Sequence, residues 1–141
     1  MRPINPLAAV VLFAIVTVEV GGWSLLGILT SENRLTPFEE QFFRAGHAHA
    51  GVLLILALAF LILLERTRYE GKAQLWLSLT LLLGILLQSG GFFLHMTVGE
   101  EGAASVGTWV TRAGGVLLAV ALIALGLGLL RAQRTTDSLS S

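Results

Sequence analysis

Residues 46–64 have the sequence GHAHAGVLLILALAFLILL, which contains no lysine, arginine or acidic residue. A helix needs about 20 mainly apolar residues to cross the roughly 30 Å hydrocarbon core of a bilayer. Three further stretches reach this length, so that the candidate spans lie at 7–29, 46–64, 75–96 and 107–130. The sequence therefore predicts an all-α membrane protein built as a bundle of four transmembrane helices.

The composition favours the same class of protein. Of the 141 residues, 55% are hydrophobic and only 13% are charged, whereas soluble domains carry about 25% charged residues. Nine lysines and arginines balance nine acidic residues, so the chain has no net basic charge to attract nucleic acid. The absence of cysteine excludes disulfides, thiolate nucleophiles and thiolate metal sites. We expect the lipid bilayer to be its main partner.

One transmembrane domain is expected over residues 1–130. The first span is too long for a signal peptide and carries Glu19, and no small-residue cleavage site follows it, so we expect it to be retained. Residues 131–141, RAQRTTDSLSS, are polar and lack an apolar period. This pattern predicts a disordered cytoplasmic tail.

The positions of the basic residues predict the orientation. Basic residues collect on the cytoplasmic side of a membrane. Most of them lie at the two ends of the chain and in the loop between the second and third spans: Arg2, Arg66, Arg68, Lys72, Arg131 and Arg134. The first loop carries Arg34 and Arg44. We therefore expect a multi-pass protein of the cell (cytoplasmic) membrane, with both termini inside.

With that topology the ionisable residues inside the spans share one layer. The outer halves of the four spans hold Glu19, His47, His49, His95 and Arg112, whereas the inner halves contain little that is polar. A charged residue at the centre of a membrane helix costs about 2.5–3.5 kcal/mol on insertion scales, and such residues usually face a bundle interior or a cavity. The sequence thus predicts a site in the outer half of the bundle.

Helical phase refines this prediction. Gly84, Gln88, Gly91 and His95 follow one helix face, and glycine on such a face lets a neighbouring helix approach closely. His47 and His49 are two positions apart, about 200° around an ideal helix. They should therefore serve different partners, unless the start of their helix is unwound.

The residue types suggest a metal or haem. Imidazole binds copper, zinc and iron, including haem iron, so the candidate metal ligands are His47, His49, His95 and Glu19. A haem b between facing helices takes two axial histidines. His95 with His47 or His49 could supply them, and Arg112 or Arg44 could neutralise a haem propionate. The expected cofactor is haem b or a copper, zinc or iron ion.

The stretch FRAGHAHAGVLL, residues 43–54, resembles the Gly-His-x-His openings of histidine-bearing helices in haem–copper oxidase subunit I and in related small four-helix membrane proteins. This resemblance, which covers about a dozen residues, implies that His47, His49 and His95 ligate haem or metal. Three histidines are too few for two haems and a copper, and no tyrosine lies near the pair. The resemblance therefore does not extend to oxygen reduction.

Three hypotheses on function follow from the sequence. The leading one is a haem- or metal-binding membrane protein for electron transfer, sensing or metal handling. The second is an accessory or assembly subunit of a larger membrane complex, whose polar layer bonds its own or partner helices; Glu19 and Arg112 would then form a structural ion pair. The third is a small-solute or proton-coupled carrier, which would need a homo-oligomer to complete a pathway. Whether the protein is an enzyme stays open.

Overall fold

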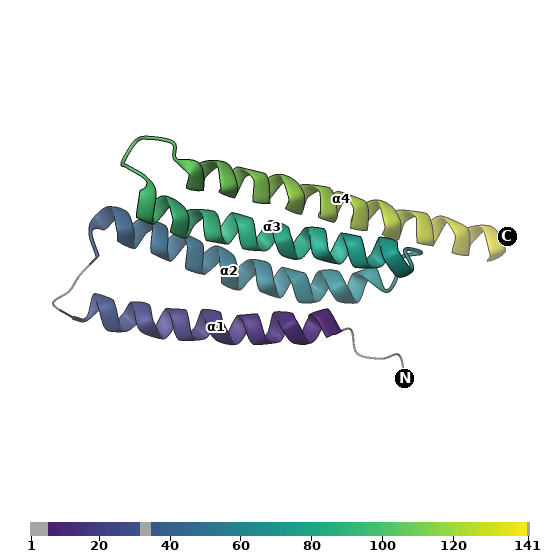
Figure 1. Cartoon of the computed structure of the whole chain (residues 1–141). Helices are drawn as coiled ribbons and strands as arrows, with labels where there is room; N and C mark the ends of the chain where they lie inside the picture. Colours follow the sequence, from purple (N-terminus) through teal and green to yellow (C-terminus); the bar gives the residue numbers. More distant parts are fainter. Residues whose placement is uncertain (1–5, 32–34, 141) are drawn as a thin grey trace.

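In the part of the chain that the structure describes, four long helices form a bundle (Figure 1). The computed structural model describes residues 6–31 and 35–140, except for the side chains of residues 134–140. The helices are α1 (Pro6–Leu29), α2 (Pro37–Leu64), α3 (Gly71–Val98) and α4 (Val106–Ser140). Each of them is long and apolar enough to cross a membrane. The predicted class is therefore confirmed: the chain is an all-α, multi-pass membrane protein that contacts the lipid bilayer.

Helix α2 begins earlier than the apolar run that predicted it. Thr36 caps the helix: its hydroxyl accepts a hydrogen bond from the backbone N–H of Glu39, and the Glu39 carboxylate accepts one from the N–H of Thr36 at 2.8 Å. This capping box, with Pro37 in the first turn, starts a helix whose first turns are polar. The two histidines of α2 therefore lie well inside a regular helix rather than in an unwound start.

Helix α4 continues past the end of its apolar run. The sequence predicts a disordered tail over residues 131–141, whereas in this structure the backbone is helical as far as Ser140. The segment contains arginine, alanine and glutamine, which favour helices, and neither glycine nor proline to end one. Residue 141 lies outside the described residues, as do Arg2 and Arg34 of the orientation argument.

The helices lie side by side in chain order (Figure 1), with the closest packing between α3 and α4 and the loosest at α1, which packs mainly on α2. Apolar side chains fill the core in the middle of the bundle and toward the end at which α2 ends and α3 begins. The buried set is Val11, Leu54, Ala57, Phe60, Leu61, Leu64, Leu81, Ile85, Leu118, Ala121 and Leu125. We call the opposite end, where α1 and α3 end and α2 and α4 begin, the histidine end.

Glycines bring α3 and α4 into backbone contact. A Cβ atom added to Gly114 of α4 would overlap the backbone nitrogen of Gln88 and lie 2.7 Å from the carbonyl oxygen of Gly84. One added to Gly91 of α3 would lie 2.8 Å from the carbonyl oxygen of Gly107. The close approach predicted for the face that carries Gly84, Gly91 and His95 is confirmed, because backbone atoms of α4 lie directly against both glycines.

We expect Gly114→Ala to destabilise the bundle by about 1–3 kcal/mol, because the added methyl group forces two backbones apart. Gly126→Ala on the same helix is the matched control, since a Cβ there meets no atom within 4 Å. Unfolding midpoints in mixed detergent micelles measure both variants. Equal midpoints for the two would contradict the proposed role of the glycine contact.

Candidate ligand site at the histidine end

His95 is the buried histidine, and two hydroxyl groups hold its ring. Its side chain is 7% exposed, and Nδ1 lies 2.7 Å from Ser105 Oγ and 3.3 Å from Thr108 Oγ1. Ser105 immediately precedes α4, and its hydroxyl accepts the backbone N–H of Gly107 at 3.1 Å. The N–H of Ser105 in turn donates to Thr108 Oγ1 at 3.1 Å. The cap of α4 thus also orients the imidazole on α3.

Aromatic rings cover the other side of His95. The ring of Phe42, from α2, meets the imidazole edge-on with 4.3 Å between ring centroids, and the ring of Phe38 lies 5.5 Å away. When Nδ1 donates its proton to one of these hydroxyl groups, Nε2 is unprotonated and can bind a ligand. A metal-binding histidine has this arrangement, in which its other nitrogen is bonded to an orienting group.

His49 belongs to the same cluster of rings. Its Nδ1 lies 2.8 Å from the carbonyl oxygen of Ala45. Because a carbonyl can only accept a hydrogen bond, Nδ1 carries the proton and Nε2 is unprotonated in the neutral ring. The imidazole packs on Phe92, with 4.7 Å between centroids, and Phe92 lies 6.4 Å from Phe42. The rings follow one another in the order His49, Phe92, Phe42 and His95.

His47 faces a different neighbour. A Cβ atom added to Gly22 of α1 would lie 3.1 Å from His47 Nε2, and one added to Gly21 would lie 3.6 Å from its Nδ1. The ring therefore fills the seam between α1 and α2, where paired glycines leave room for it. The prediction that His47 and His49 serve different partners is confirmed.

Glu19 and Arg112 are both exposed, on α1 and α4. The guanidinium of Arg112 lies 4.8 Å from the centre of the Trp109 ring. The structural ion pair considered for Glu19 and Arg112 does not form within the chain: over residues 6–31 and 35–133 the ion pair present joins Arg44 to Glu40, at 2.9 Å.

In the same part of the chain, no three histidine or acidic residues stand close enough to hold a metal ion. The four predicted metal ligands are therefore not gathered at one point.

A cavity of about 470 Å³ opens beside His95, within the roughly 300–1,000 Å³ typical of small-molecule and cofactor sites. Of the three histidines, His95 is the one that lines it. Phe42 and Phe92 form apolar walls, and the 102–104 segment of the α3–α4 loop borders it. Its remaining polar lining comes from Thr108, Thr111 and Arg112. The cavity thus joins one buried imidazole and one guanidinium across an aromatic surface.

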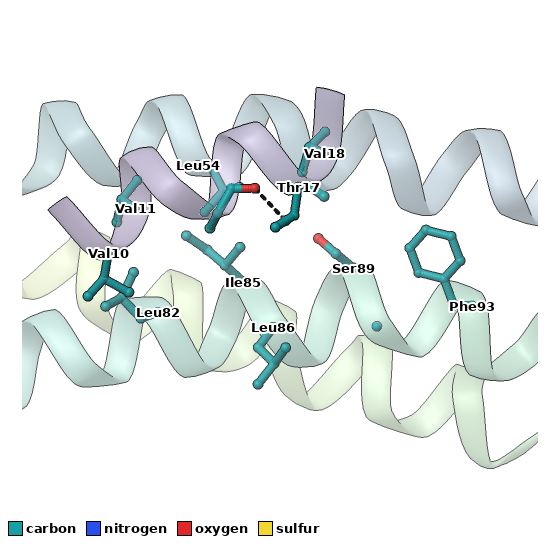
Figure 2. A pocket seen from close by; sticks show the side chains of 13 residues that line it. Val10, Val11, Thr17, Val18, Leu54, Leu82, Ile85, Leu86, Ser89 and Phe93 are labelled. Carbon is teal, nitrogen blue, oxygen red and sulfur yellow. Dashed lines mark hydrogen bonds between the residues drawn. The ribbon is translucent and has the colours of Figure 1, made fainter. Parts of the chain in front are cut away.

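A second cavity, of about 430 Å³, lies between α1, α2 and α3 (Figure 2). Its lining contains no ionisable side chain, and its two hydroxyl groups belong to Thr17 and Ser89. The hydroxyl of Thr17 donates to the carbonyl of Ala14 at 2.7 Å, whereas the buried hydroxyl of Ser89 has no hydrogen-bond partner among the described residues. This cavity offers shape and apolar contact but no group that could ligate a metal.

Sequence reasoning missed several residues of the site. Ser105 could have been found, because a serine three residues before Thr108 and next to an apolar run is a pattern typical of a helix start. Phe42 and Phe92 had no such signal, since aromatic residues in a membrane helix are usually packing residues. Their role depends on which way each helix is turned.

No family model, curated protein or solved structure matches this chain. The resemblance of residues 43–54 to oxidase helices therefore stays a prediction.

We expect Ser105→Ala to lower the free energy of unfolding by about 0.5–2 kcal/mol, because it removes the acceptor for the Gly107 N–H and the partner of His95. Thr97→Ala is the control: this exposed hydroxyl donates only within its own helix, to the carbonyl of Leu94, and its loss should change stability by less than about 0.5 kcal/mol. Thermal unfolding in detergent compares the two. A Ser105→Ala protein as stable as the Thr97→Ala protein would rule out this role.

Proposed function

We propose that the protein binds one haem b at the histidine end, where His95 would hold it, and that it acts as a sensor or electron carrier in the cell membrane. The observation that carries this proposal is the buried imidazole of His95, which is anchored through Nδ1 by Ser105 and Thr108 beside an aromatic cavity. Ligand histidines are commonly fixed in this way, through the ring nitrogen that does not bind the metal.

Haem suits the residues better than a bare metal ion does. A copper or zinc site takes three or more side chains from the protein, and no such group exists among the described residues. A porphyrin supplies four nitrogens itself and needs one or two histidines. His95 alone could therefore hold a haem, although it could not hold a zinc ion.

The rest of the lining also supports haem. Phe42 and Phe92 offer apolar faces to a flat ring, and Arg112 offers a guanidinium to a propionate, a pairing in which arginine binds a carboxylate through two parallel N–H groups. The positive-inside rule places the histidine end at the outer face of the membrane, where a propionate can reach water. The bound haem would supply a redox-active iron with affinity for small ligands.

The role of the protein residues follows from their positions. Ser105 and Thr108 would orient His95, the phenylalanines would exclude water from one side of the ring, and Arg112 would fix its edge. Because His95 is the one histidine in the lining, a haem held there would have a single protein ligand, and its iron could take a small exogenous ligand. This arrangement favours sensing over electron transfer between two fixed histidine ligands.

An absorption spectrum of the purified protein tests the proposal. After titration with haemin we expect a Soret band with one haem per chain, and at least a tenfold weaker affinity in His95→Ala, because the iron loses its protein ligand. His47→Ala is the matched control: it removes a histidine that faces α1 rather than the cavity, and it should bind haem as the unchanged protein does.

Two results would contradict the proposal. One is a folded protein that neither shifts nor sharpens the Soret band of the added haemin, which would leave the accessory-subunit hypothesis in place. The other is equal haem affinity in the His95→Ala and His47→Ala proteins, which would show that the haem binds elsewhere.

A further inference from the structure

Two opposite charges lie on opposite flanks of the bundle. Glu19 is exposed on α1 and Arg112 is exposed on α4, and these two helices are the outermost of the four (Figure 1). Neither side chain forms an ion pair within the described part of the chain. Each therefore presents a charge to whatever covers the flank of its helix in the membrane.

The packing contacts place Glu19 level with the middle of the histidine half of α3. Val18, the neighbour of Glu19, lines the cavity shown in Figure 2 together with Ser89 of α3. The lining extends from Val10 to Val18 along α1 and from Leu82 to Phe93 along α3, and Figure 2 shows Val18 and Ser89 at about the same position along the helices. Glu19 and Ser89 are therefore at about the same depth in the bundle.

Contacts between α3 and α4 relate the depth of Ser89 to a position on α4. Gly91, two residues beyond Ser89, packs directly on Thr111, which is the neighbour of Arg112 in the sequence. Two residues of helix correspond to about 3 Å along the axis. Glu19 and Arg112 thus lie within about one helical turn of the same depth.

Each charge belongs to an exposed stripe with the spacing used in helix–helix packing. On α1, Phe13, Val16, Val20 and Trp23 recur every three or four residues. On α4, Val116, Val120 and Ile123 do so, and Arg112 continues the spacing back to Trp109. All of these apolar side chains are more than half exposed. Stripes at this spacing are the ridges through which membrane helices pack side by side.

We propose that copies of this chain assemble head to tail in the membrane, so that Glu19 on α1 of one copy pairs with Arg112 on α4 of the next. A charged side chain that faces lipid is costly, by about 2.5–3.5 kcal/mol on insertion scales, and such groups pair with one another. One chain carries both halves of a complementary pair at one depth and on opposite flanks. Repetition of this heterologous contact builds a closed ring where its rotation closes.

This contact is compatible with a ligand in the cavity. The guanidinium of Arg112 has five N–H donors, enough to bind Glu19 of the neighbouring copy and a carboxylate from the cavity together. The assembly itself requires no haem, and its test below is read without one. Failure of the haem proposal and failure of the assembly are therefore distinguishable.

Cysteine cross-linking tests the assembly directly, because the natural chain has no cysteine. Val16 lies about one turn deeper than Glu19 and Val116 about one turn deeper than Arg112, so the two should meet across the contact. We expect co-expressed Val16→Cys and Val116→Cys chains with different tags to form a mixed disulfide dimer in native membranes on mild oxidation. Neither variant alone should cross-link, and Ile62→Cys, exposed on α2, should not cross-link with either.

Two outcomes of this experiment would overturn the proposal. If Val16→Cys or Val116→Cys cross-links to itself as efficiently as the mixture does, the contact is isologous rather than head to tail. If the mixture gives no more disulfide than the Ile62→Cys control, the two flanks do not meet.

A charge exchange tests the pair itself. Glu19→Arg or Arg112→Glu, introduced into both tagged cysteine chains, should lower the yield of mixed dimer about tenfold or more, because like charges then face each other. The double variant with both changes should restore the yield, since it only reverses the pair. A double variant no better than the single ones would refute the ion pair.

Discussion

The backbone contact between α3 and α4 is the constraint on which the site depends. Gly84 meets the backbone of Gly114, and Gly91 meets the backbone of Gly107, so the two helices are held at a fixed distance and register. That register brings the start of α4 against the last turns of α3, where the Ser105 hydroxyl reaches His95. A larger residue at any of these glycines would separate the imidazole from its two anchors.

Polar and apolar side chains are distributed unevenly along the length of the bundle. Apolar side chains fill the core away from the histidine end, and the buried Ser78 satisfies its hydroxyl within its own helix by donating to the carbonyl of Gln74. A proton or solute pathway would need polar groups along the whole length of the bundle, whereas a bound cofactor needs them at one place. The arrangement at His95 and Arg112 therefore favours a bound group over a carrier, and the flanking charges favour assembly over isolation.

The structural features that depend on composition and on helical phase were predicted from the sequence. Span positions, the close approach through Gly91 and the divergence of His47 from His49 all follow from apolar length or from 100° per residue. The sequence did not predict which side chains are in contact, because the depth of a residue in the membrane does not say which way its side chain faces. Glu19 shares a layer with the histidines, yet its helix turns it outward. Helix α2 begins early, at Pro37, because Thr36 caps it, and a hydropathy pattern does not detect such a cap.

The site requires that His49 and His95 are each held through Nδ1 and present a free Nε2, and the protonation of the ring nitrogens tests this directly. Nitrogen-15 NMR of histidine-labelled protein without haem, assigned with single histidine variants, reports the tautomer of each ring. We expect a protonated, hydrogen-bonded Nδ1 and an unprotonated Nε2 at both residues. A proton on Nε2 of His95, with Nδ1 accepting from the Ser105 hydroxyl, would contradict the account, because that ring would have no nitrogen free to bind a metal.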